Sequence, residues 1–128
     1  MSPSTSSLEV VKAFARAWEA MDLDAVVNAF APDAIYHNMP MDPAVGRKAI
    51  RQMVGYWLES TTQMRWELRG LAEISPGVVF AERLDTFKMR GVTVALPCAG
   101  VFEITDGLIT AWRDYFDQAT VERRLGAV

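Results

Sequence analysis

Residues 77–89 are Gly-Val-Val-Phe-Ala-Glu-Arg-Leu-Asp-Thr-Phe-Lys-Met, a stretch in which an arginine and an aspartate stand among apolar residues. Ser75-Pro76 precedes it and Gly91 follows it, which predicts a β-strand between two turns. Since side chains alternate along a strand, one face would carry Val79, Ala81, Arg83, Asp85 and Phe87. Charges on such a face must be paired or used, because an unpaired charge is costly in apolar surroundings. The sequence therefore poses one main question, which is what Arg83 and Asp85 do.

The composition indicates one globular domain over residues 1–128, because 51% of the residues are hydrophobic and four are tryptophan. A net charge of −3 without a basic run gives no reason to expect nucleic-acid binding. A membrane-spanning helix needs an apolar stretch of about 18 residues, and no stretch in this sequence approaches that length. We therefore expect no membrane partner. The first residues show no secretory signal, and the single cysteine, Cys98, cannot form an internal disulfide. We therefore expect a cytoplasmic protein.

The first half of the chain predicts three helices after a loose tail over residues 1–5. Ser6-Ser7-Leu8-Glu9 matches a capping box, and apolar residues at helical spacing predict a helix over 7–20. A shorter helix begins near Asp22 and ends at Ala31-Pro32-Asp33. A short strand over 34–39, a loop over 41–45 and a third helix over 47–59 complete this half.

The second half predicts four strands, over 64–74, 78–89, 93–105 and 108–117, and then a short helix over 118–125. The connections are short, and Asp106-Gly107 between apolar runs favours a β-hairpin. Helices followed by a run of strands indicate the α+β class. We expect a curved mixed, largely antiparallel sheet that wraps around the helices and leaves a conical pocket for a ligand.

Three more polar residues fall in predicted strands. Tyr36 and Asn38 are two apart and would point the same way, and Asp114 would share a face with Trp112 and Phe116. Each has an ordinary explanation: a surface or cross-strand salt bridge for Arg83 with Asp85, turn hydrogen bonds for Tyr36 and Asn38, and a loop cap for Asp114. The sequence alone leaves these explanations open.

The alternative is that the five polar residues form one acid–base site. A guanidinium can bind two carboxylates at once, so one acid could act as a base while the other keeps a proton. A phenol and an amide could hold a water molecule beside them. The only histidine is His37, so no Ser-His-Asp or Cys-His arrangement is present, and no metal-ligand spacing or phosphate loop is evident. We therefore expect acid–base chemistry with no metal and no cofactor.

Three segments carry a resemblance to a known family. They are Tyr36-His37-Asn38-Met39-Pro40, Glu82-Arg83-Leu84-Asp85, and residues 100–117, which include Trp112-Arg113-Asp114-Tyr115-Phe116. With these segments the chain resembles limonene-1,2-epoxide hydrolase, within the cone-shaped superfamily that also contains ketosteroid isomerases and polyketide cyclases. The resemblance implies the cystatin-like or ketosteroid-isomerase-like cone and a homodimer.

The resemblance also implies how the reaction would proceed. Asp114 would be the general base on a water held by Tyr36 and Asn38, and Asp85 would protonate the epoxide oxygen. Arg83 would bridge the two acids. The epoxide would open in one step to a vicinal diol, without a covalent enzyme intermediate.

The pocket wall follows from the phase of the strands, and ordinary core packing is the alternative for each of its residues. We expect it to include Met39, Met64, Phe87, Leu96, Cys98 and Phe116. Such a wall suits a small apolar epoxide, cyclic or aryl. Two other functions remain open: a ketosteroid-isomerase-like or polyketide-cyclase-like enzyme on the same fold, and a non-catalytic ligand-binding or dimerisation module.

Overall fold

The computed structural model describes residues 6–126, so the tail expected over residues 1–5 lies outside the described residues. The elements in chain order are α1 (Ser7–Glu19), α2 (Leu23–Asn28), β1 (Phe30–Asn38), β2 (Ala44–Val45), α3 (Gly46–Glu59), β3 (Thr61–Ser75), β4 (Val78–Met89), β5 (Val92–Thr105), β6 (Leu108–Phe116) and α4 (Gln118–Leu125).

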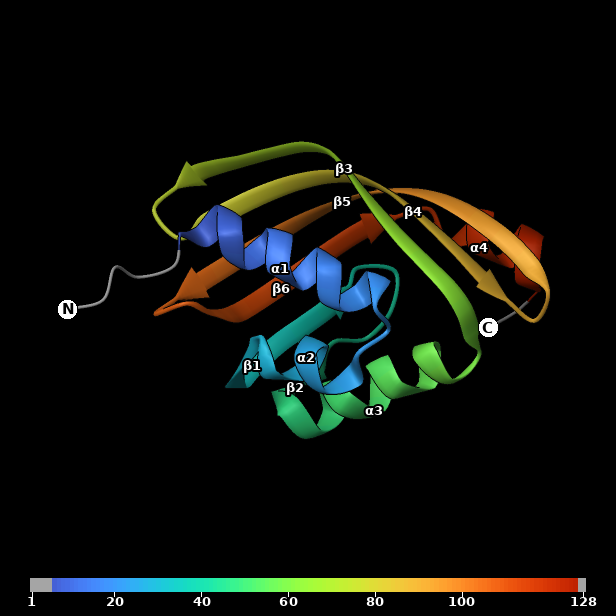
Figure 1. Cartoon of the computed structure of the whole chain (residues 1–128), viewed down its shortest axis with the longest axis horizontal. Coiled ribbons are helices and arrows are strands. Elements are labelled where there is room, and N and C mark those ends of the chain that lie inside the picture. Colours follow the sequence, from blue (N-terminus) through green and yellow to red (C-terminus); the bar gives the residue numbers. More distant parts are fainter. Residues whose placement is uncertain (1–5, 127–128) are drawn as a thin grey trace.

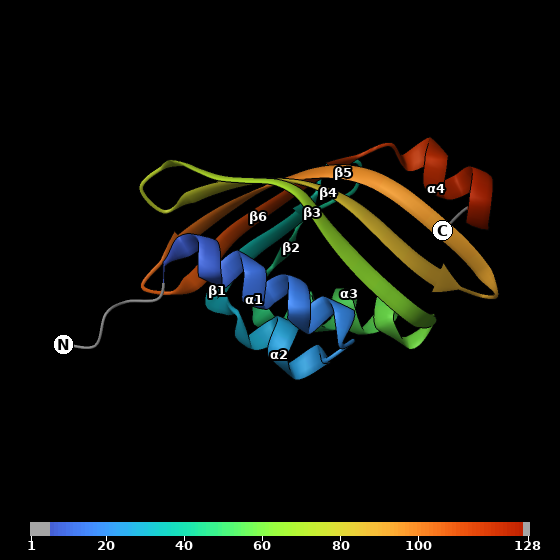
Figure 2. The ribbon, with the colours of Figure 1, turned by 45° about the horizontal axis from the view of Figure 1, so that its top comes forward.

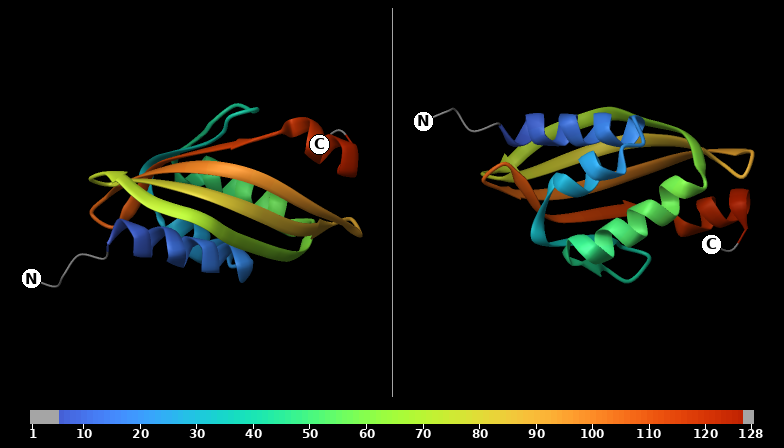
Figure 3. Two further views of the ribbon diagram at one scale, coloured as in Figure 1. Left: turned by 90° about the horizontal axis from the view of Figure 1, so that it is seen from above. Right: turned by 60° about the horizontal axis from the view of Figure 1, so that its bottom comes forward.

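The strands form one six-stranded sheet in the order β2-β1-β6-β5-β4-β3 (Figure 1). β1 pairs with β6 in parallel, and every other neighbouring pair is antiparallel. The sheet is strongly curved, and α1, α2 and α3 lie on its concave side (Figure 2). α4 lies at one end of the sheet, beside the β4–β5 hairpin (Figure 3). The predicted fold class, an α+β cone with a curved mixed sheet, is confirmed.

Local sequence signals set the strand connections. Pro76-Gly77, Arg90-Gly91 and Asp106-Gly107 are each two-residue links, and the second residue of each has a positive φ of 76° to 78°. Glycine adopts this backbone conformation at little cost, which explains its place in all three turns. α1 begins at the predicted Ser6 cap, whose Oγ accepts a hydrogen bond from the Glu9 N–H. The Glu9 carboxylate, however, accepts a hydrogen bond from Lys12.

The prediction was wrong where β1 begins. The second helix ends at Asn28, and β1 starts at Phe30, four residues before the strand predicted from the sequence. Long-range contacts decide this: the Ile109 N–H donates to the Ala29 carbonyl, and Arg47 donates two hydrogen bonds to the Phe30 carbonyl. The register shift between Phe30 and Ile35 accommodates a proline, which has no N–H to give to the ladder.

Two smaller corrections concern strand ends. β3 begins at Thr61, three residues earlier than predicted, because its first residues pair with the end of β4. The loop expected over 41–45 contains β2, a two-residue strand paired with β1.

The core lies between the concave face of the sheet and α1 to α3. Phe14 of α1 is at its centre and makes edge-to-face contacts with the rings of Trp18, Phe30, Trp66, Phe102 and Trp112. Such contacts add to the free energy gained from burying the rings. Within residues 6–126, no helix has both the length and the apolar character that a membrane crossing requires.

Candidate active site

Arg83 lies between Asp85 and Asp114 and binds both carboxylates. Its Nε and Nη2 donate to Asp85 Oδ1 and Oδ2 over 3.0 and 2.7 Å. Its Nη1 and Nη2 donate to Asp114 Oδ1 and Oδ2, each over 2.7 Å. The arginine side chain is fully buried, and the carboxylates are 12% and 7% exposed. The pair on β4 is therefore not a surface salt bridge but two members of a buried network of three charges, whose third member is Asp114.

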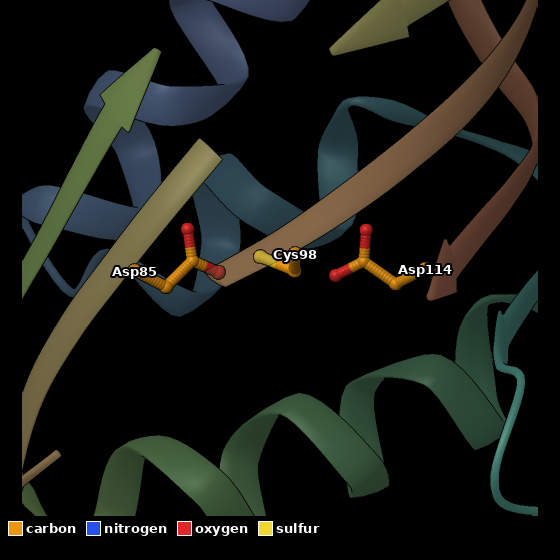
Figure 4. Close-up of side chains that lie close together, drawn as sticks. All are labelled: Asp85, Cys98 and Asp114. Carbon is orange, nitrogen blue, oxygen red and sulfur yellow. The ribbon is translucent and has the colours of Figure 1, made fainter. Parts of the chain in front are cut away.

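Two strands supply these charges to the same point of the concave face. Arg83 and Asp85 are two apart on β4, and Asp114 comes from β6, with β5 between them. Figure 4 shows the two carboxylates on either side of Cys98, which lies on β5. The face predicted from alternation is confirmed, since Val79 and Ala81 are buried as well.

Two tryptophans surround the guanidinium. The Cζ atom of Arg83 lies 4.0 Å from the ring centre of Trp66 and 5.7 Å from that of Trp112. The indole N–H of Trp112 also donates to Asp114 Oδ1 over 3.0 Å. A cation over an aromatic face is attracted by the ring, so these rings help to compensate for the water that Arg83 has lost.

Tyr36 and Asn38 reach the same site from β1. Parallel pairing puts Asn38 opposite Asp114 and Tyr36 opposite Trp112, and the Met39 N–H donates to the Asp114 carbonyl over 2.9 Å. The Tyr36 ring stacks on Trp112 with 4.2 Å between the ring centres. Both residues are 4% exposed, and both line the cavity described below. The structure thus brings all five predicted polar residues together.

The surroundings change the acidity of these groups. Burial raises the pKa of Asp114 above its usual value, although Arg83 and the Trp112 N–H act in the opposite direction. Burial also raises the pKa of Tyr36, so its phenol stays protonated. Burial disfavours the charge on Arg83, but the two carboxylates outweigh it and hold the pKa of Arg83 well above its usual value. With both acids ionised the three side chains carry a formal net charge of −1.

An apolar cavity opens in front of the carboxylates, and Arg83 lies behind them. Four of the six predicted wall residues line it: Met64, Phe87, Leu96 and Phe116. Met39 does not, because β1 ends at Asn38 and Met39 is 37% exposed at the following turn. Cys98 is buried but also outside the lining, because its short side chain stays between the two carboxylates.

Five residues that were not predicted from the sequence complete the wall: Trp18, Trp57, Thr61, Trp66 and Val121. Trp18 and Trp57 belong to the apolar faces of α1 and α3, where helical spacing indicates only core packing. Val121 is the buried residue of α4 and packs with Phe87 and Leu96. A surplus of aromatic residues in a short chain was the available signal, but it does not say which rings face a cavity.

Asp85, Cys98 and Asp114 are close enough to suggest a metal site, since their ligand atoms lie within 4.8 Å of one another. The donor chemistry argues against one. All four carboxylate oxygens already accept hydrogen bonds from Arg83, whose positive charge would repel a cation placed there. Burial also raises the pKa of the Cys98 thiol, whereas a metal ligand must be a thiolate.

Comparison with known proteins identifies the family. Residues 5–125 match the family model described as limonene-1,2-epoxide hydrolase catalytic domain. The chain belongs to the limonene-1,2-epoxide hydrolase family. It is 33% identical over 111 residues to a Mycobacterium tuberculosis protein named epoxide hydrolase EphG, covering 84% of this chain and 70% of that protein.

Solved structures agree with this family and with the cone. The structure of a limonene-1,2-epoxide-hydrolase-like epoxide hydrolase from M. tuberculosis has a TM-score of 0.80 at 26% identity, over 91% of this chain and 86% of that one. A hypothetical protein with a ketosteroid isomerase-like fold from Catenulispora acidiphila has a TM-score of 0.84 at 21% identity, over 97% and 96%. The second likeness shows the fold alone, because this fold carries several chemistries.

Proposed function

We propose that this protein is a cofactor-free epoxide hydrolase that adds water to a small apolar epoxide in one acid–base step. The observation that carries the proposal is that Arg83 forms ion pairs with two carboxylates at the floor of an apolar cavity. Family membership supports the reaction class, and the geometry supports the roles given below.

In this proposal Asp114 is the general base. Its Oδ1 accepts from both Arg83 and Trp112, whereas its Oδ2 accepts one hydrogen bond, from Arg83. A carboxylate oxygen has two acceptor positions, so Oδ2 keeps one for a water molecule. Tyr36 and Asn38 lie beside it on the cavity wall and would orient that water. The raised pKa of Asp114 makes it a stronger base than an ordinary aspartate.

Asp85 is the general acid in the same step. The water oxygen forms a bond to one ring carbon, that carbon's bond to the epoxide oxygen breaks, and Asp85 gives its proton to the leaving oxygen. Asp114 takes a proton from the water at the same time, so the product is a neutral vicinal diol. The cluster then has to return one proton from Asp114 to Asp85. Acid and base contributions of this kind are typically about 10²–10⁴-fold each.

The cavity wall supports an apolar substrate. Three tryptophans, two phenylalanines, a leucine and a methionine face the space in front of the acids. An apolar ring gains free energy on leaving water for such surroundings, and the polar groups at the floor would fix its epoxide.

The test is a panel of epoxides, namely styrene oxide, cyclohexene oxide and limonene oxide, assayed for diols on a chiral column. Asp85→Asn and Asp114→Asn should each abolish diol formation and leave the circular dichroism spectrum unchanged. Asp117→Asn is the matched control, because Asp117 is an exposed helix cap and asparagine also caps helices well. Near wild-type turnover by Asp85→Asn would refute the assignment of the acid.

A single-turnover reaction in water enriched in the heavy isotope of oxygen tests the direct attack. Label in the diol of the first turnover supports attack by water, and an unlabelled first product would show that an enzyme carboxylate attacked. An isomerase, a cyclase or a non-catalytic binding module would give no diol from any member of the panel.

We also propose that the protein is a homodimer. Within residues 6–126 no helix covers the outer face of the sheet, and four apolar residues on that face are 40% to 61% exposed: Ile35, Val45, Phe80 and Tyr115. Exposed apolar residues gathered on one face are typical of interaction surfaces. Sedimentation at micromolar concentration should give a dimer, and a monomer would contradict this proposal.

A further inference from the structure

The strand between the two acids carries a glycine at the point where Arg83 crosses it. β5 pairs Gly100 with Ala81 of β4 on one side and with Asp114 of β6 on the other. The backbone of Gly100 is not in the left-handed region, unlike that of the turn glycines, so any residue could adopt it. Space, and not backbone conformation, must explain a glycine here.

A methyl group at residue 100 would meet the charged network. An ideal Cβ would lie 2.7 Å from Asp114 Oδ1, 2.9 Å from Arg83 Nη1 and 3.1 Å from Trp112 Nε1. These are the same atoms that join Arg83 and Trp112 to Asp114 by hydrogen bonds of 2.7 and 3.0 Å. Two of these atoms are at the ends of the Asp114 and Arg83 side chains, which would give way before the β5 backbone, whereas the Trp112 ring is held by its stacking on Tyr36.

We propose that Gly100 is a positioning residue: the space above it lets Arg83 reach across β5 and hold Asp114 with Oδ2 turned toward the water. The role in catalysis rests on the proposed epoxide hydrolysis, whereas the steric relation between Gly100 and the ion pair does not. Gly100 does not line the cavity, so its effect on the substrate is indirect.

Gly100→Ala should therefore lower kcat and leave KM nearly unchanged. A displacement of about 1 Å at a reacting group can cost about 10²-fold in rate, and we expect a fall of this size. Gly70→Ala is the matched control, a glycine of β3 whose new Cβ would lie 3.7 Å from the Glu82 Cβ, an ordinary contact. It should keep the wild-type kcat.

The pH profile separates positioning from simple loss of folded protein. Arg83 lowers the pKa of Asp114, so moving the two apart should raise that pKa further. The acidic limb of kcat/KM should therefore move to higher pH in Gly100→Ala. Wild-type kcat, or a reduced kcat with an unmoved acidic limb, would overturn the proposal.

A stability cycle tests the steric relation without any substrate. Gly100→Ala should lower the melting temperature less in an Asp114→Ala background than in the wild type, because the oxygen that it meets is gone. If Gly100→Ala alone does not fold, folding in the Asp114→Ala background supports the proposal, and failure in both overturns it. Equal losses of melting temperature also overturn it. If the wild type hydrolyses no epoxide, the proposed function fails, while this cycle still decides whether Gly100 accommodates the ion pair.

Discussion

Replacing Arg83 by methionine tests whether the buried charges depend on one another. Methionine keeps the unbranched apolar stem but lacks the guanidinium, so the change removes four hydrogen bonds to two carboxylates with at most 12% exposure. Removing one partner of a buried ion pair costs about 3–5 kcal/mol, because the remaining charge is left uncompensated. We expect the free energy of unfolding to fall by about this amount at neutral pH.

The loss of stability in Arg83→Met should also depend on pH, and its direction follows from the linkage between proton binding and folding. Without Arg83, Asp114 loses a group that favours its charged form, so the pKa of Asp114 in the folded variant rises above that in the wild type. The folded variant then binds more protons than the folded wild type as the pH falls. Its stability relative to the wild type should therefore recover on going from about pH 7.5 to about pH 5.

Urea denaturation of the wild type and of Arg83→Met at about pH 7.5 and about pH 5 measures the free energy of unfolding of each. Arg69→Met is the matched control, since Arg69 makes a solvent-exposed pair with Glu67 at 3.1 Å and such pairs contribute about 0–1 kcal/mol. A cost for Arg83→Met as small as that for Arg69→Met, or a cost that is the same at both pH values, would refute the reasoning.

Three further predictions concern single groups. Asp114 must be ionised to accept a proton, and burial raises its pKa above 3.8, the ordinary value for an aspartate. kcat/KM should therefore fall on acidification with a midpoint above 3.8, and a midpoint at or below 3.8 contradicts the base assignment. Val121→Ala removes two buried carbons from α4, so urea titration should show a loss of about 1.6 kcal/mol at about 0.8 kcal/mol each, and no loss would mean that α4 does not dock as described. Arg47→Met leaves the Phe30 carbonyl without its two donors and should lower the free energy of unfolding by about 1–3 kcal/mol. Lys48→Met should change that free energy little, and equal effects of the two variants would show that the Arg47 contact does not anchor β1.

The sequence by itself determined the local pattern of the site. Alternation on β4 put Arg83 and Asp85 on the buried face, and alternation on β1 put Tyr36 and Asn38 on one side. Two-residue turns with glycine fixed the hairpins between β3 and β6. These features depend on covalent geometry and on contacts between near neighbours in the chain, so they can be predicted from spacing.

Only the tertiary structure decided which of these residues meet. Asp114 meets Arg83 because only β5 separates β6 from β4, and the long arginine side chain reaches across it. Asn38 meets Asp114 because β1 pairs with β6 in parallel. The start of β1 and the aromatic wall were missed for the same reason, since they depend on packing between elements far apart in sequence. An apolar helical face looks the same in sequence whether its tryptophan fills a core or borders a cavity, because both are shielded from water.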